Sequence, residues 1–359
     1  MNVSGTSNDD QHPDPQDDQS IPEHGASDSS LYELEFPAPV VTADEGTGPV
    51  LVHALEGFAD AGQAVAIAAE HLRQSLDSEL LATFSGDELI DYRSRRPTMT
   101  FSGAEFTGVQ MPSLTMHAIR DNAGRPFLLL SGAEPDLRWE QFVAAIRRLC
   151  DRLGVSSVVG LNAIPMAVPH TRPSTITAHG SAQHLLGDLP RWGNAMKIPG
   201  SASTLLELRL AQHGYDTAGL SVHVPHYLAQ AQYPAASSKL VGTLGDVTGL
   251  ELPTAALDNA ATDVRAQIDA EVEGNAEVES VVRALEEQYD AYTDSRAESE
   301  SLLAADQPLP SGDEIGAELE RFLAGHLGDE GSTGDEPDGN DRGDLRGDDS
   351  PGDAPRAGE

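Results

Sequence analysis

The chain alternates between short apolar runs rich in β-branched residues and longer segments whose apolar positions repeat with a helical period. Residues 50–55 are predicted to form a buried strand, residues 61–76 a helix, and residues 80–84 the next strand. Further strands are expected at 127–130, 155–164 and 220–224, and further helices at 139–153 and 205–212. Strands joined through helices pair in parallel. We therefore predict an α/β fold with a mostly parallel sheet covered by helices on both faces.

A different pattern begins near residue 257, where apolar residues recur every three or four positions without intervening strands. Residues 257–268 and 278–292 are predicted to form two long amphipathic helices separated by Gly274 and Asn275. A third, shorter helix is expected from Ser311, which has Glu314 as its capping-box partner. These helices either pack on the α/β core or present an apolar stripe to a partner or to a second copy of the chain.

Both ends of the chain are acidic and poor in apolar residues. Residues 1–30 contain seven acids and no Lys or Arg, and residues 328–359 contain eleven acids and three arginines. Such segments cannot bury enough apolar surface to offset the entropy lost on ordering. We therefore expect disordered acidic tails at 1–30 and 328–359, an α/β core domain at 31–252 and a C-terminal helical extension at 253–327.

The formal net charge of -37 excludes some classes of partner. An acidic surface repels nucleic-acid phosphates and anionic lipid headgroups, so neither nucleic acid nor membrane is an expected partner. Lys197 and Lys239 are the only lysines, which fits either a GC-rich genome or adaptation to salt. No apolar run has the length of a membrane span, the N-terminus does not resemble a signal peptide, and Cys150 is the single cysteine, in an apolar helical pattern. We expect a cytoplasmic protein with a buried, unreactive thiol.

The first candidate site lies between the strand at 50–55 and the following helix, at Gly57 to Gly62. Backbone N–H groups at such a position can bind an anion, but the segment has neither a P-loop nor a dinucleotide fingerprint. A tight turn with Asp60 as the helix cap, and Gln63 as its capping-box partner, explains the sequence equally well.

A second candidate is an arginine cluster in an otherwise acidic chain. Arg93, Arg95 and Arg96 follow one another within the segment Asp91 to Pro97. Guanidinium groups bind carboxylates, so these arginines either pair with acids of the same fold or bind an acidic partner.

The third candidate comprises two proline-flanked loops that each follow a predicted strand. One loop contains His170, Thr171 and Arg172, and the other contains His226 and Tyr227. Loops that follow parallel strands lie at the carboxyl edge of the sheet, where ligands of open α/β sheets usually bind. No HExxH or GxSxG motif accompanies them, so a structural or recognition role is favoured over catalysis.

Six segments together carry a family resemblance: Gly57 to Gly62, Asp91 to Pro97, Glu134 to Trp139, Pro169 to Pro173, Pro225 to Tyr227, and Tyr233 with Pro234. In order and spacing they resemble the proteasome assembly chaperone family, second-subunit type, in its actinobacterial branch. The resemblance runs from about residue 31 to about residue 327 and implies a core like that of nucleoside phosphorylases, self-association and a link to proteasome assembly. Eukaryotic relatives can dock through a C-terminal hydrophobic-Tyr-any residue tail, whereas this chain ends in Ala357, Gly358 and Glu359, so docking of that kind is not expected.

The leading hypothesis is therefore a homo-oligomeric protein-binding factor that resembles a proteasome assembly chaperone, acts by protein–protein interaction rather than catalysis, and needs no metal or cofactor. The alternative is a small-molecule enzyme or ligand-binding protein, such as the ATP-dependent carboxylate ligase that some relatives are labelled as. That alternative requires five residues to converge on one concave site: Gly57, Arg96, His170, Arg172 and His226. A third possibility is a scaffold kept soluble by its acidic tails.

Overall fold

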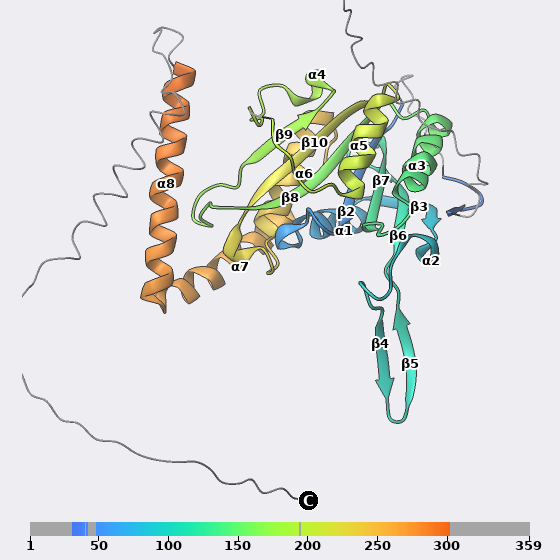
Figure 1. Cartoon of the computed structure of the whole chain (residues 1–359), viewed down its shortest axis with the longest axis horizontal. Helices are drawn as coiled ribbons and strands as arrows, with labels where there is room; N and C mark the ends of the chain where they lie inside the picture. Colours follow the sequence, from blue (N-terminus) through green and yellow to red (C-terminus); the bar gives the residue numbers. More distant parts are fainter. Residues whose placement is uncertain (1–30, 40, 42–47, 194, 302–359) are drawn as a thin grey trace, which may run out of the picture. The chain divides into compact units, whose positions relative to one another are not determined.

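A computed structural model describes residues 31–39, 41, 48–193 and 195–301, with side chains placed up to residue 294. Its main element is an eight-stranded sheet in the order β1-β3-β6-β7-β2-β8-β10-β9 (Figure 1). The strands are β1 (Tyr32–Leu34), β2 (Val50–Glu56), β3 (Asp77–Phe84), β6 (Leu114–Arg120), β7 (Pro126–Ala133), β8 (Ser157–Met166), β9 (Ile176–Gly180) and β10 (Asp216–Pro225).

The centre of the sheet is parallel and its outer strands are antiparallel. Strands β7, β2, β8 and β10 pair in parallel, whereas β1, β3 and β6 on one side and β9 on the other pair antiparallel to their neighbours. The carboxyl ends of the four central strands therefore meet at one edge, which fixes where the candidate loops lie.

Helices cover both faces, because the central strands are apolar on both sides. On β2, Leu51 and Leu55 point into one core, and Val52 and Ala54 point into the other. Helices α1 (Ala64–Ser75) and α6 (Pro234–Thr248) cover the face of Val52, while α3 (Trp139–Leu153) and α5 (Ala202–Gln212) cover the face of Leu51 (Figure 1). The predicted α/β class, with helices on both faces, is confirmed.

The predicted helical extension is also present, as α7 (Ala255–Glu273) and α8 (Ala276–Ser301). Leu257 and Ile268 of α7 pack on the same core as α6. The helix predicted from Ser311 and the two acidic tails lie outside the described residues. None of the described helices is both long and apolar enough to cross a membrane.

The remaining elements are short. They are the one-turn helices α2 (Gly86–Leu89) and α4 (Gln183–Leu186), the 3-10 turns η2 (Ala61–Gln63) and η3 (His226–Leu228), and a hairpin of β4 (Thr98–Ser102) and β5 (Glu105–Gln110). The hairpin was not predicted, and it extends away from the eight-stranded sheet (Figure 1). Every residue of both its strands is exposed.

Cys150 lies inside α3, as predicted. Its thiol is buried, and burial raises its pKa to about 12, so the thiolate is scarce at neutral pH.

Candidate functional site

The turn that follows β2 binds a carboxyl side chain of the protein itself, that of Glu134. Glu134, directly after β7, is buried and accepts the N–H of Phe58 at 3.0 Å with one oxygen. Its other oxygen accepts the N–H of Ala202, the first residue of α5, at 2.6 Å. A Cβ atom at Gly57 would lie 2.3 Å from Glu134 Oε2, so a glycine is needed for this approach. Glu134 thus joins the loops after β2 and β7 to the start of α5.

Asp60 directly precedes η2, and its side chain caps the first turn of α1. Its Oδ1 accepts the N–H of Val65 at 2.7 Å. Burial raises the pKa of this carboxyl to about 7, although the backbone N–H groups at the start of α1 favour its charged form. The prediction that Gln63 completes a capping box is wrong, because Gln63 has a φ of 52° and its side-chain oxygen faces Gln232.

The arginine cluster lies beside the same loops. The guanidinium of Arg95 is 3.3 Å from Asp136, which follows β7, and donates to the carbonyl of Glu56 at the end of β2 at 3.1 Å. Arg93 pairs with Asp91 within its own segment at 3.1 Å, and Arg96 is exposed. Arg95 therefore ties its segment to the carboxyl ends of two strands.

The loop after β8 is anchored to η3 and α7 through His170, which is buried. The Tyr227 oxygen accepts the backbone N–H of His170 at 2.8 Å and lies 2.6 Å from His170 Nδ1. His170 Nε2 is 3.0 Å from Asp269 of α7. Since a carboxylate needs a donor, Nε2 carries the proton, and the Tyr227 hydroxyl donates to Nδ1. Burial raises the pKa of Tyr227 to about 12, which keeps that hydroxyl protonated.

Thr171 and Arg172 connect the same loop to α8. Arg172 donates to both carboxylate oxygens of Asp290, at 2.8 and 2.7 Å, and to Glu286 at 3.2 Å. Thr171 donates a hydrogen bond to Glu286 as well. These carboxylates raise the pKa of Arg172 above its usual value. His226 is exposed, and its ring contacts that of Tyr227 edge-on.

The structure therefore assembles the predicted residues into two groups along the carboxyl edge. Gly57, Asp60 and Arg95 belong to the group around β2 and β7, and His170 to Arg172 belong with Tyr227 to the group around β8 and β10. A cavity of about 520 Å³ adjoins the second group and is lined by His170, Thr171 and Arg172. Gly57, Arg96 and His226 do not line it.

A buried polar cluster on the α5 side of the sheet was not predicted from the sequence. Glu207 of α5 accepts from His179 of β9 at 2.8 Å and lies 3.6 Å from His53 Nε2. His53 and Glu207 are both buried, and the Ser203 hydroxyl lies 3.3 Å from His53 Nδ1. A Cβ atom at Gly160 would lie 2.3 Å from Glu207 Oε1, so this glycine of β8 makes room for the cluster.

The charges of this cluster are set by mutual pairing. The hydrogen bond that His179 donates to the Glu207 carboxylate raises the pKa of His179. Burial opposes ionisation of Glu207, but pairing with His179, which donates a hydrogen bond to it, outweighs burial and lowers the pKa of that carboxyl. Burial lowers the pKa of His53, which keeps it neutral. No cluster of His, Cys, Asp and Glu within the described part of the chain has the arrangement of a metal site.

Fold and edge loops together define an α/β protein with a C-terminal helical extension and a carboxyl edge whose charged side chains are largely paired internally. Residues 54–272 match the model of the PAC2 family. The chain belongs to this family, and the predicted resemblance to proteasome assembly chaperones of the second-subunit type is thereby confirmed.

Solved structures agree with this assignment. The chain is 53% identical to the Mycobacterium tuberculosis protein of unknown function Rv2714, with a TM-score of 0.73 over 76% of this chain and 95% of that one. It is 45% identical to a protein of unknown function from Corynebacterium glutamicum, with a TM-score of 0.72 over 74% and 99% of the two chains. The Mycobacterium tuberculosis proteasome-assembly chaperone homologue Rv2125 is 26% identical, with a TM-score of 0.59 over 65% and 99%. No curated protein matches the chain.

Proposed function

We propose that this chain is a homo-oligomeric protein-binding factor that assists the assembly of proteasome subunits or of a similar ring complex. Membership of the PAC2 family, together with the similarity to the proteasome-assembly chaperone homologue Rv2125, carries the proposal. Its surface would comprise the carboxyl-edge loops, the hairpin and the helical extension.

The pairing of the edge residues supports binding over catalysis. His170 is held between Tyr227 and Asp269, and Arg172 is held by Glu286 and Asp290. A general acid or base needs a side chain that can reach a substrate. Exposed groups such as Arg96 and His226 remain available to a protein partner.

The hairpin adds a second supporting observation. Four large apolar side chains on its two strands are between 50% and 68% exposed: Met99, Phe101, Phe106 and Val109. A two-stranded hairpin is marginally stable in water on its own, and clustered exposed apolar side chains are typical of protein interfaces. Such an arm fits contact with another protein or with a second copy of the chain.

Purified proteasome α-subunits from an actinobacterium provide the test. The full chain should bind these subunits and speed the appearance of α-rings in native mass spectrometry, and bovine serum albumin at equal concentration should not. If neither binding nor faster ring formation is seen at low or moderate salt, the proposal is contradicted.

The alternative of a small-molecule site around Gly57, Arg96, His170, Arg172 and His226 receives less support. Of these residues, only His170 and Arg172 line the cavity described above. Any ligand of that cavity must therefore be recognised by a different set of side chains.

A further inference from the structure

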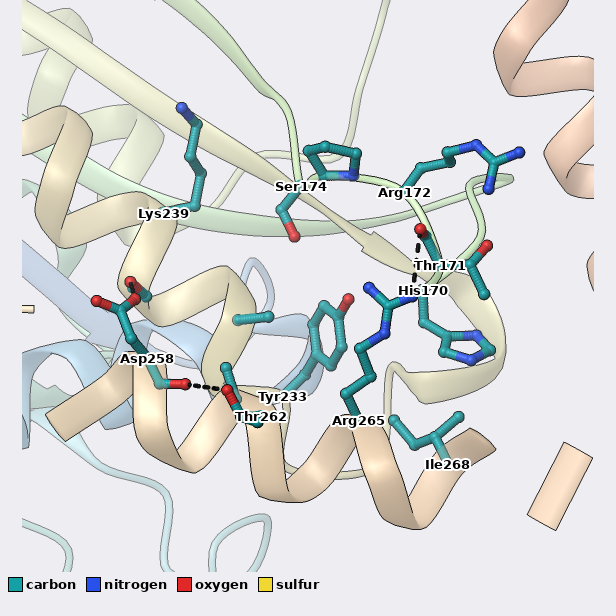
Figure 2. A pocket seen from close by; sticks show the side chains of 14 residues that line it. His170, Thr171, Arg172, Ser174, Tyr233, Lys239, Asp258, Thr262, Arg265 and Ile268 are labelled. Carbon is teal, nitrogen blue, oxygen red and sulfur yellow. Dashed lines mark hydrogen bonds between the residues drawn. The ribbon is translucent and has the colours of Figure 1, made fainter. Parts of the chain in front are cut away.

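The cavity of about 520 Å³ lies between α6, α7 and the loop after β8 (Figure 2). Helix α6 contributes Lys239, α7 contributes Arg265 and Asp258, and the loop contributes Arg172 and Ser174. Apolar contacts come from Pro173, Ala235, Ala261 and Ile268. A volume of this size can hold a small organic molecule.

The charge of the lining is opposite to that of the chain. The lining includes three cations, Arg172, Lys239 and Arg265, and one carboxylate, Asp258, whereas the whole chain has 22 Lys and Arg against 59 Asp and Glu. Asp258 is already bound, because it accepts from the hydroxyls of Ser238 and Thr254. Cations gathered in a concave site of an otherwise acidic protein attract anions by focusing the local potential.

Two of the three cations retain capacity for a ligand. Arg172 is occupied by Asp290 and Glu286. Arg265, by contrast, has only long contacts, 3.4 Å to the carbonyl of Thr171 and 3.6 Å to Asp269. Lys239 makes no ion pair with any residue that the structure describes. Its exposed ammonium group is therefore free to bind an anion.

Hydroxyl donors lie between these two cations. In Figure 2, Tyr233 and Ser174 lie between Lys239 on one side and Arg265 on the other. The ring of Tyr233 is buried, and burial raises the pKa of its hydroxyl, although Ser174 and the charge of Arg265 act in the opposite direction. Both hydroxyls are therefore neutral groups that can donate to anionic oxygens.

We propose that this cavity binds a small organic molecule through carboxylate or phosphate oxygens, with Lys239 and Arg265 as the charged contacts and Ser174 and Tyr233 as hydroxyl donors. The apolar lining would contact the body of the ligand. This inference does not depend on the proposed assembly function, and it assigns a ligand class to a cavity that shares a loop with the protein-binding edge.

Titration calorimetry on the full chain tests the proposal, with inorganic phosphate and succinate as separate probes at constant ionic strength. One of the two anions should bind, and Lys239→Met should weaken its affinity by about tenfold or more, as expected for loss of a charge-assisted contact. Arg265→Met should weaken it similarly. Comparison of the two probes shows whether the site prefers phosphate or carboxylate.

Lys197→Met is the matched control, since Lys197 is the other lysine of the chain and does not line the cavity. It should bind the anion like the unmodified chain. Because Lys239 has no ion-pair partner to lose, its variant should keep the same thermal unfolding temperature without ligand. The proposal is overturned if neither anion binds, or if Lys239→Met binds as tightly as Lys197→Met.

Discussion

At the scale of single residues, pairing between distant side chains decides which groups are charged. Glu207 is buried yet ionised, because His179 donates a hydrogen bond to it. A buried carboxylate without such partners would take up a proton instead. Glu134 is likewise held by distant groups, since its two oxygens accept the backbone N–H groups of Phe58 and Ala202.

Removal of the Glu207 carboxylate should expose the strength of this pairing. We expect Glu207→Ala to lower the free energy of unfolding by about 2 kcal/mol, since it removes the acceptor of the His179 hydrogen bond and leaves the buried His53 ring beside an empty space. Glu207→Gln should cost less, and it should lower the pKa of His179, because the hydrogen bond that His179 donates to the charged carboxylate raises that pKa. Urea unfolding and histidine NMR titration measure the two effects. Glu140→Gln, which removes one partner of the exposed ion pair between Glu140 and Arg209, should change neither the free energy of unfolding nor the pKa of His179 by much. An unchanged pKa of His179 in Glu207→Gln would contradict this account.

Asp60 should make stability depend on pH in the opposite sense from a salt-bridged acid. Its pKa is raised from 3.8 to about 7 in the folded protein, so the folded state binds the proton more tightly than the unfolded state. Stability from this group is therefore present at low pH and declines as the pH rises from about 4 to about 7. Asp60→Asn keeps an oxygen for the Val65 N–H and should raise the melting temperature at pH 8 more than at pH 5. Asp246→Asn, at an exposed position, should show no such difference.

At the scale of elements, what the sequence could predict depended on whether the signal was local. The apolar run at 50–55 and the helical stripe at 139–153 were sufficient to predict a strand and a helix, because burial imposes the periodicity of apolar residues in each. The hairpin around Gly103 was missed because its apolar residues belong to neither of the two cores formed by the described residues. Alternating β-formers on either side of a Gly turn were the signal that could have identified it. Antiparallel pairing at the sheet edges has no comparable local signal.

The positions of the candidate loops could be predicted from the topology of the sheet. The acidic side chains that bind these loops could not. Residues that follow parallel strands must reach the same edge, so His170 and Tyr227 could be expected to lie together. The acids that bind this loop, such as Asp269 and Asp290, lie about a hundred residues further along the chain on helices that carry many other acids. The His53 cluster was missed for the same reason, since Glu207 and Gly160 lie far from His53 in sequence.

At the scale of the whole molecule, the hairpin gives the proposed self-association a specific test. Phe101 and Phe106 contact each other edge-on with ring centroids 5.2 Å apart, and both are exposed. Burial of such a pair between copies would favour association through its apolar area. We expect the unmodified chain to be an oligomer in light scattering coupled to size exclusion, and Phe101→Ser with Phe106→Ser to reduce its mass to that of the monomer.

The fold should survive this double substitution, because neither phenylalanine belongs to the two cores of the large sheet. Circular dichroism and the melting temperature measured at low protein concentration should therefore stay close to those of the unmodified chain. Phe36→Ser provides the control, since Phe36 is 96% exposed and lies outside the hairpin. If Phe36→Ser dissociates the oligomer and the hairpin variant does not, association depends on the surface near β1. If the unmodified chain is a monomer, the hairpin does not mediate self-association. It would then be expected to bind a different protein, because the apolar side chains of the hairpin have no core to pack on within the described chain.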